Sequence, residues 1–263
     1  MSAKIFASIA VAITGLVLLY GVSDFPTFGD PRSPASAGVA GGAPSASQYY
    51  INQSYGVTKV PNLVTSVLAD YRGYDTMLET VVVFAAGMAI FAILRVVGSG
   101  SRNPVDAPSA ASIDGDHHRI IVGTTCRIAV PVVQIFALYV VAHGHHSPGG
   151  GFQGGVMLGA SFILIALAGN LDDALGRFSE RAYLSLAAIG IMIYAGFGVV
   201  PQVLGKNFLD YGVLQHLLLT DSPAMARSHS MLGVEIGVAL TVMSIMFAIF
   251  ANLSSRGSLR GGL

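Results

Sequence analysis

Six long apolar stretches constrain the fold of this chain more than any other feature of its sequence. A helix needs about 20 mostly apolar residues to cross the roughly 30 Å hydrocarbon core of a bilayer. The stretches are close to that length and cover 5–22, 76–97, 120–142, 152–170, 182–200 and 231–251. Lipid offers no hydrogen bonds to a backbone, so only helices and closed barrels cross it. Unbroken apolar runs, without the alternation of barrel strands, predict six transmembrane helices in a 2 + 4 arrangement.

The composition excludes an ordinary soluble domain. Only 11% of the 263 residues are charged and 53% are hydrophobic, whereas soluble domains carry about 25% charged residues. The formal net charge is zero, so nothing in the charge favours binding to nucleic acid. The single cysteine, Cys126, excludes an intramolecular disulfide. We therefore predict an all-α integral membrane protein.

The first apolar stretch has two interpretations. Lys4 before it and the small residues ASA at 35–37 are compatible with a cleaved signal peptide. Its 18 residues exceed the usual signal core of about 7–15 residues, which favours a retained helix.

Two polar segments divide the chain into modules. Residues 23–58 are rich in Pro, Gly, Ser and Ala, which predicts an irregular linker. Residues 98–118 form a second polar linker. We therefore expect a two-helix module at 1–97 and a four-helix domain at 119–263.

The segment 59–75 is expected to contain a short amphipathic helix at the membrane interface, just before the second span. Its apolar residues recur at helical spacing: Val60, Leu63, Val64, Val67 and Leu68.

The basic residues favour an orientation with both termini inside the cell. In that orientation the inner side holds eight of them, namely Lys4, Arg95, Arg102, Arg119, Arg177, Arg181, Arg256 and Arg260. The outer side holds five, namely Arg32, Lys59, Arg72, Lys206 and Arg227. Glu79 and Glu235 then lie near the outer face.

Three ionisable residues fall inside the expected spans. Glu79 lies about one turn into the second span, Arg127 about two turns into the third and Glu235 about one turn into the sixth. Charges inside a membrane are costly and mark ion pathways or buried pairs. Alternatively, each carboxylate pairs with a base of a neighbouring subunit or extends to the interface, since it lies within ~6 Å of a helix end.

Arg127, Pro131 and Gln134 share one face of the third helix. Arg127 stays protonated at physiological pH, so we expect it to anchor a carbonyl or carboxylate, or to tune a carboxylate nearby. Pro131 is expected to kink the helix and to free a carbonyl near residue 127, which is a potential cation ligand.

Glycines at four-residue spacing predict close helix packing. They are Gly151, Gly155 and Gly159 in the fourth helix, and Gly233 and Gly237 in the sixth.

The stretch HGHHSPGGGFQGG, residues 143–155, has three interpretations. Its three histidines are metal ligands by type, but a zinc site would need a fourth ligand from elsewhere in the chain. A phosphate cradle would need the strand and the lysine that nucleotide-binding loops use. We favour a turn: Pro148 stops the third helix, three glycines tolerate positive φ, and Phe152 begins the fourth.

The stretch DYRGYDTMLE, residues 70–79, gathers Arg72 and three carboxylates. Asp75 is a candidate N-cap, with Glu79 in the first turn of the following helix. The same carboxylates, with Asp70, are hard oxygen ligands of the kind that alkali cations use.

The turn and the apolar helix after it resemble the signature of the B subunit of Mrp-type multisubunit cation/proton antiporters. The matching residues are Gly144, His145, Pro148, Gly149, Gly150, Gly151, Phe152, Gly154 and Gly155. His146 stands where that family usually has asparagine. The resemblance covers about 119–251, including the helices that carry Arg127 and Glu235.

The front of the chain, about 5–97, resembles a different piece. VLADYRGYDTMLE is similar to part of the C-terminal extension of the antiporter's large A subunit, which also occurs as a small subunit of related membrane-bound hydrogenases. The matching residues are Asp70, Arg72, Asp75, Thr76 and Glu79. The chain thus looks like a fusion of two modules, which implies that they are neighbours in the assembled complex.

The resemblance implies a subunit of a Na⁺/H⁺ antiporter, not an enzyme, in the cell membrane of a bacterium or archaeon. It implies partners, namely large proton-channel subunits and other small ones, and no cofactor or resident metal. The implied pathway residues are Glu79, Asp75 and Asp70, followed by Glu235 and His145. Residues with an implied shaping or tuning role are Arg127, Pro131, Arg72, Gly149, Gly150, Gly151 and Phe152.

Two other functions stay open. The front module also fits the membrane arm of a redox-driven, hydrogenase-like ion pump. The abundance of small residues and the scarcity of intramembrane charge also fit a scaffold subunit that carries no ions.

Overall fold

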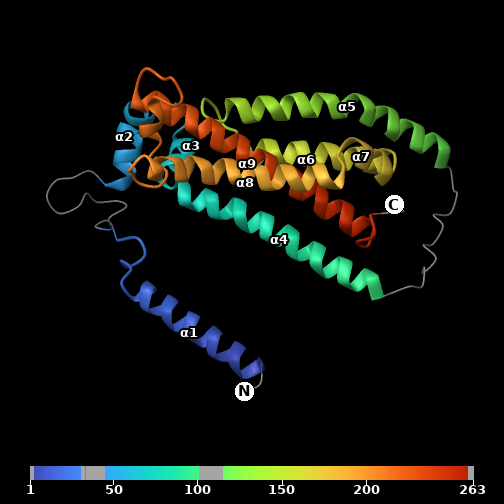
Figure 1. Cartoon of the computed structure of the whole chain (residues 1–263), viewed down its shortest axis with the longest axis horizontal. Coiled ribbons are helices and arrows are strands. Elements are labelled where there is room, and N and C mark those ends of the chain that lie inside the picture. Colours follow the sequence, from blue (N-terminus) through green and yellow to red (C-terminus); the bar gives the residue numbers. More distant parts are fainter. Residues whose placement is uncertain (1–2, 31–32, 34–44, 101–114, 260–263) are drawn as a thin grey trace. The chain divides into compact units, whose positions relative to one another are not determined.

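The computed structural model describes residues 3–30, 33, 45–100 and 115–259 (Figure 1). Every regular element in these residues is a helix, which confirms the all-α class. The ASA motif at 35–37 and residues 101–114 of the second expected linker lie outside the described residues.

Six long helices of the described chain carry apolar segments able, by length and composition, to cross a membrane, as the sequence predicts. They are α1 (Ala3–Ser23), α4 (Gly73–Gly100), α5 (Gly115–His143), α6 (Gly151–Ala168), α8 (Glu180–Val203) and α9 (Pro223–Ser254). The shorter elements are α2 (Ala46–Thr58), α3 (Leu63–Thr65), the π-helix η1 (Ser66–Tyr71), α7 (Leu171–Arg177) and the 3-10 helix η2 (Tyr211–Gln215).

Helix α2 corrects the expectation of an irregular linker over 23–58, which is wrong for residues 46–58. Ser45 and Gln48 form a capping box. The Gln48 N–H donates to the Ser45 hydroxyl at 3.2 Å, and the Ser45 N–H donates to the Gln48 side chain at 3.3 Å. Two N–H groups are thereby satisfied at the helix start, and the proline-free sequence that follows becomes helical.

The chain divides into two compact units, residues 1–53 and 54–263. The first unit contains α1 and the beginning of α2. The second contains the other elements, so α4 belongs to the same unit as α5 to α9 and packs along α8 and α9.

Helix α9 is the centre of the second unit. In its most apolar segment 72% of the residues are buried, against 33% or less in each of the other long helices. Helices α4, α6 and α8 pack around it (Figure 1). Residues on α9 are therefore shielded on several sides, whereas α4 and α5 keep most of their surface exposed.

The apolar core of this unit consists of two clusters. One surrounds Tyr194 and Tyr211 and includes Met231 from the first half of α9. The other contains Phe178 and Phe247, whose rings stack with their centroids 5.5 Å apart. Apolar burial therefore fixes α9 on either side of its middle.

The glycines of α6 lie against α9 in a matching four-residue register. Gly151, Gly155 and Gly159 face Glu235, Ala239 and Met243. A Cβ at Gly155 would lie 2.9 Å from the Ala239 carbonyl oxygen, and a Cβ at Gly151 would overlap the Glu235 backbone. The close packing predicted from the glycine spacing is thus confirmed, since the two backbones approach where side chains would keep them apart.

The expected helix within 59–75 is present as α3 and η1. One of its faces is exposed and apolar, and the opposite face is buried. Val64 and Leu68 are 62% and 47% exposed, as an apolar face at the membrane interface requires. Val60, from the same expected face, is buried instead. The opposite face, with Thr65 and Asp70, is buried against the rest of the unit, which the amphipathic pattern does not indicate.

Candidate functional site

Glu235 lies deep in α9, not one turn from its end as the sequence predicts. Helix α9 begins at Pro223, well before residue 231. Ser222 caps it, because its hydroxyl accepts the Met225 N–H at 3.2 Å. Pro at the first helical position is favourable, so the Ser-Pro pair was the signal for this start. Glu235 is therefore about three turns, or roughly 18 Å, from the helix start.

The Glu235 carboxylate is buried with an incomplete set of partners. The residue is 7% exposed, and its Oε2 atom has no hydrogen-bond partner among the described residues. Burying a charged carboxylate without compensation is costly. The group therefore requires a proton on it or a cation beside it.

The backbone of the turn between α5 and α6 covers this carboxylate. Helix α5 ends at His143 and α6 begins at Gly151, which confirms the predicted turn between two helices. A Cβ at Gly144 would lie 2.6 Å from Oε2 of Glu235, and a Cβ at Gly150 would lie 3.2 Å from Oε1. Gly150 also has a φ of +136°, which side chains disfavour. Glycine is thus what lets this turn approach the carboxylate.

Asn62 and Thr65 hold the turn from the front of the chain. The Asn62 side-chain amide donates to the carbonyl oxygens of Gly144 at 2.7 Å and Ser147 at 2.8 Å. The Thr65 hydroxyl donates to the same Gly144 oxygen at 2.7 Å. The segment before α4 and the turn before α6 are therefore neighbours, as the resemblance to a fusion implies.

A pocket of about 110 Å³ lies beside the turn and brings two of the expected pathway residues together. Glu79 lines it from α4 and Glu235 lines it from α9. The rest of its polar and turn lining consists of Thr65, Thr76, Thr80, Gln153, Gly149, Gly150, Gly151 and Phe152. Among the described residues no lysine, arginine or histidine lines the pocket.

The threonines of the pocket have oxygen lone pairs to offer. Thr80 donates its proton to the Thr76 carbonyl at 2.8 Å, and Thr76 donates to the Leu68 carbonyl at 2.9 Å. A hydroxyl used as a donor keeps its two lone pairs for an acceptor role. Because Glu79 is exposed and Glu235 is buried, the pocket joins a carboxylate at the surface to one in the interior.

Asp70, another expected pathway residue, forms a buried ion pair instead of lining this pocket. Its two carboxylate oxygens accept from Nε and Nη2 of Arg227 at 2.7 and 2.9 Å. The Asp70 side chain is 2% exposed. Nothing in the sequence indicates this pair, because its partners lie 157 residues apart. Tyr211 holds the same segment by donating to the Ala69 carbonyl at 3.0 Å.

Asp75 and Arg72 form an exposed ion pair at the start of α4. Their Oδ2 and Nη2 atoms are 2.6 Å apart, and the side chains are 44% and 63% exposed. Helix α4 already begins at Gly73, so Asp75 lies in its first turn and not at the N-cap. An exposed pair of this kind adds little stability.

His145 lies in the turn but does not line the pocket of Glu79 and Glu235. Its Nδ1 atom is buried without a hydrogen-bond partner among the described residues. Burial, followed by the nearby rings of His146, His143 and His229, lowers the pKa of His145 below its usual value. In the described chain no three His, Cys, Asp or Glu side chains are arranged to hold a metal ion.

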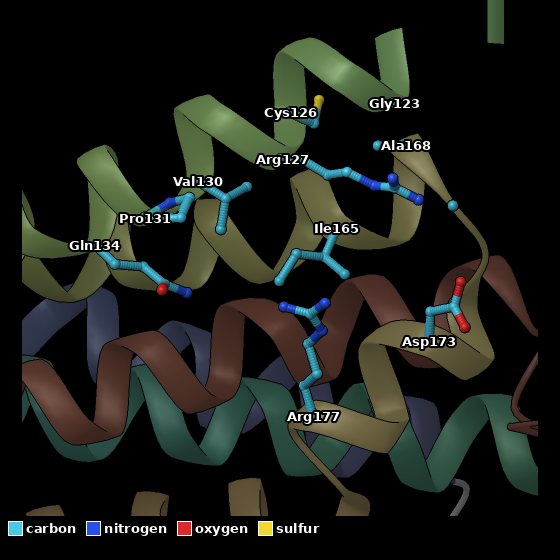
Figure 2. A pocket seen from close by; sticks show the side chains of 11 residues that line it. Gly123, Cys126, Arg127, Val130, Pro131, Gln134, Ile165, Ala168, Asp173 and Arg177 are labelled. Atoms are coloured by element: carbon cyan, nitrogen blue, oxygen red, sulfur yellow. The ribbon is translucent and has the colours of Figure 1, made fainter. Parts of the chain in front are cut away.

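A second pocket, of about 400 Å³, contains the expected face of α5 (Figure 2). Arg127, Pro131 and Gln134 all line it, together with Arg177 of α7. The Gln134 amide donates to the Ser161 hydroxyl of α6 at 3.0 Å, and α5 continues as a helix through Pro131. The prediction that these three residues share a face is confirmed.

Comparison with known proteins identifies two segments of the chain. Residues 121–248 match the family model described as a domain related to the MnhB subunit of Na⁺/H⁺ antiporter. Residues 41–111 match the family model MbhE, which describes one of the subunits of MBH. The antiporter subunit mnhB2 of Staphylococcus haemolyticus is 31% identical over 137 residues, 51% of this chain and 94% of that protein. The mnhB2 subunit of Staphylococcus aureus strain Newman is 27% identical over 137 residues, which again cover 51% of this chain and 94% of that protein.

Two solved structures share the fold. A chain of the Mrp complex from Dietzia sp. DQ12-45-1b matches 95% of this chain with a TM-score of 0.60 and 24% identity. This chain spans 26% of that longer chain. A chain of the membrane-bound sulfane sulfur reductase, an archaeal respiratory complex, matches 92% of this chain and 97% of its own length, with a TM-score of 0.55 and 24% identity. Because the mnhB2 subunit of Staphylococcus haemolyticus is 31% identical to this chain over 94% of its own length, the chain belongs to the MnhB family of antiporter subunits.

Proposed function

We propose that this protein is a membrane subunit of a multisubunit Na⁺/H⁺ antiporter, and that the pocket between Glu79 and Glu235 is part of its cation and proton pathway. The observation that carries the proposal is the buried Glu235 carboxylate, which has a free oxygen and faces a pocket without basic residues in the described chain. The match to mnhB2 over nearly the whole length of that protein supports the assignment to an antiporter.

The chemistry of the pocket supports exchange of one positive ion for another. A buried carboxylate is neutralised by a proton or by a cation, and the described lining holds no basic side chain that would do so permanently. Carboxylate, hydroxyl and carbonyl oxygens are the ligands that hard cations prefer. In this proposal a proton and Na⁺ compete for Glu235, and such competition for one group is the minimum that antiport requires.

The other expected residues take supporting roles in this proposal. Asp70 and Arg227 fix the segment before α4, so that Thr65 and Glu79 face the turn. The glycines 149–151 keep the turn close to Glu235, and Phe152 closes one side of the pocket. Asp75 forms an ion pair with Arg72 near the start of α4, so the two side chains help to fix this segment and add no net charge at the entrance.

The partners follow from the same proposal. The pocket alone does not cross the membrane, so other membrane subunits of the complex, including the large proton-channel subunits, supply the rest of the path. We further propose that the chain consists of two modules, 1–97 and 119–263, in a bacterial or archaeal cell membrane with both termini inside. The separate family matches at 41–111 and 121–248 support this division.

Charge-neutral substitutions test the pathway. Glu235→Gln and Glu79→Gln keep the size of each side chain but remove its charge, so each should reduce Na⁺-dependent proton exchange to background. The measurement is the collapse of a pH gradient by added Na⁺ in inverted membrane vesicles that contain the whole complex. Asp221→Asn is the matched control, because Asp221 is exposed and outside the pocket.

Assembly has to be followed in the same vesicles. Co-purification of the other subunits with the Glu235→Gln chain shows that the complex has formed. Full exchange by an assembled complex that carries both substitutions would contradict the pathway and would favour the scaffold function.

A redox-driven ion pump is the second candidate function. The match of 41–111 to the MbhE model, and the fold shared with the sulfane sulfur reductase chain, favour it. Purification of the native complex and identification of its subunits by mass spectrometry separate the two. Subunits that bind redox cofactors would assign this chain to a redox-driven pump. An active complex without such subunits would favour the antiporter function.

A further inference from the structure

The pocket of about 400 Å³ between α5, the end of α6 and α7 is separate from the proposed ion pathway. Two arginines from different helices line it, Arg127 of α5 and Arg177 of α7. Figure 2 shows the Arg177 guanidinium pointing from α7 toward Ile165 and α5, while Arg127 extends from α5 toward the end of α6. Both guanidinium groups therefore face the same pocket.

The positive charge in this pocket is not balanced from within the described chain. Among the described residues, neither guanidinium forms an ion pair. Asp173 is the one carboxylate that the described part of the chain contributes to the lining, and Figure 2 shows it apart from the Arg177 guanidinium. Arg127, Arg177 and Asp173 are all exposed, so two positive charges and one negative charge are open to a ligand, and the net positive charge favours an anion.

The position of Arg127 within the apolar segment of α5 strengthens the case for a bound anion. The apolar segment of α5 runs from Ile121 to His143, so Arg127 starts about 9 Å along it at 1.5 Å per residue. An arginine inside a membrane span is costly unless a counter-charge or polar group accompanies it. Arg177, in the polar helix α7, lies where the chain leaves the apolar span of α6 at Ala168.

The walls of the pocket fit an amphiphilic anion. Val130, Ile165 and Ala168 provide apolar surface beside the two guanidinium groups, and the pocket volume lies in the range of small-molecule sites. A carboxylate from a partner protein would fill little of this space. Arginine binds phosphate through two parallel N–H groups, which makes it the side chain of choice for phosphate recognition.

We propose that this pocket binds the phosphate group of an anionic phospholipid, with Arg127 and Arg177 as its ligands and the acyl chains leaving along α5. The orientation expected from the basic residues puts α7 on the inner side, where anionic lipids attract basic residues. Free inorganic phosphate has the same chemistry, so the experiment separates the two sources.

Cys126 is a built-in reporter for the pocket. It is the single cysteine of the chain and lines the pocket beside Arg127. The purified complex is placed in nanodiscs of phosphatidylglycerol or of phosphatidylcholine, and the rate of maleimide labelling of the Cys126 peptide is followed by mass spectrometry. Phosphatidylglycerol should slow labelling several-fold relative to phosphatidylcholine, and inorganic phosphate added to the phosphatidylcholine discs should not.

Substitution of the arginines identifies the ligands. Arg177→Gln should weaken phosphatidylglycerol binding about tenfold, the loss expected for a charge-assisted hydrogen bond, and Arg127→Gln should do the same. Arg181→Gln is the matched control, because it removes an exposed charge close in sequence that does not line the pocket. Native mass spectrometry of the complex gives the lipid occupancy of each variant, independently of labelling.

Three results would overturn the proposal. Equal labelling rates in the two lipids would show that the headgroup charge is not recognised. Protection by inorganic phosphate alone would make the pocket a site for free phosphate. Slow labelling that survives delipidation of the complex would show that a partner protein covers the arginines.

Discussion

At the scale of single residues, the surroundings of a carboxylate decide its role more than its position in a motif. Asp75 is exposed and pairs with its neighbour Arg72, and Asp70 is buried with a bidentate arginine. Glu235 is buried with a free oxygen. All three are carboxylates in the sequence, yet of these Glu235 is the one that no described basic side chain pairs with.

The pair of Asp70 and Arg227 should behave as a buried ion pair. Arg227→Met alone leaves a buried carboxylate unpaired, and we expect it to destabilise the protein by about 3–5 kcal/mol. Adding Asp70→Asn should restore most of that loss. Thermal unfolding of the purified chain in detergent measures both, with Arg72→Met as the exposed-pair control, expected to cost less than about 1 kcal/mol. Equal losses for the two arginine variants would show that burial of the pair does not matter.

The lowered pKa of His145 predicts a pH effect on the turn. The folded state binds a proton at His145 more weakly than the unfolded chain does, so the contribution of His145 to stability is lost as pH falls through about 6.5 and below. His145→Gln should therefore reduce the drop in Tm between about pH 7.5 and about pH 5.5. His216→Gln, at an exposed position, is the control and should leave the drop unchanged. If Tm falls as much at low pH in the His145→Gln variant as in the unchanged protein, the prediction is contradicted.

At the scale of elements, glycine contacts let the neighbouring helices lie close against α9. Gly151 of α6 faces the backbone of Glu235, and Gly190 of α8 faces Gly237. Neighbours on two sides thus approach α9 at backbone distance. A side chain at these glycines would push whole helices apart, not merely fill a gap.

Gly151→Ala tests this contact. The added methyl group overlaps the Glu235 backbone, so α6 must shift, and we expect a loss of about 1–3 kcal/mol together with reduced exchange activity. Gly196→Ala in α8 is the matched control: its Cβ meets nothing within 4 Å, and alanine favours a helix by up to about 1 kcal/mol. Thermal unfolding of the two variants gives the comparison. A Gly151→Ala protein as stable as the control would show that α6 and α9 are not tightly packed.

The sequence predicts elements well where the signal is local. Apolar runs are enough for six spans, and Pro148 with the following glycines is enough for the turn. The start of α9 and the presence of α2 depend on caps, at Ser222 and at Ser45 with Gln48, in polar stretches that hydropathy does not distinguish.

The site is predictable only in part, because its geometry is non-local. Glu79 and Glu235 are each recognisable as charges inside spans, but their meeting in one pocket depends on how α4 and α9 pack. The pairing of Asp70 with Arg227 joins parts of the chain 157 residues apart and has no sequence signal. Periodicity assigns a residue to a face of a helix; it does not say which helix that face meets.

At the scale of the whole molecule, most of the two family segments lies in one structural unit, residues 54–263. Residues that match the MbhE model carry α4, and residues that match the MnhB model carry most of α5 to α9, yet α4 packs along α8 and α9. The pocket takes one carboxylate from each segment. The proposed ion site is therefore a product of the junction, and neither segment alone contains it.

The three hydrogen bonds from Asn62 and Thr65 to Gly144 and Ser147 of the turn have a consequence for assembly. Two separate proteins would form such contacts only as often as their cellular concentrations allow, whereas tethered partners meet at effective concentrations on the order of millimolar. Three short bonds are then sufficient to hold the turn. Both segments belong to one polypeptide. Each copy of the turn is therefore made together with the Asn62–Thr65 segment that binds it, in a fixed ratio of one to one.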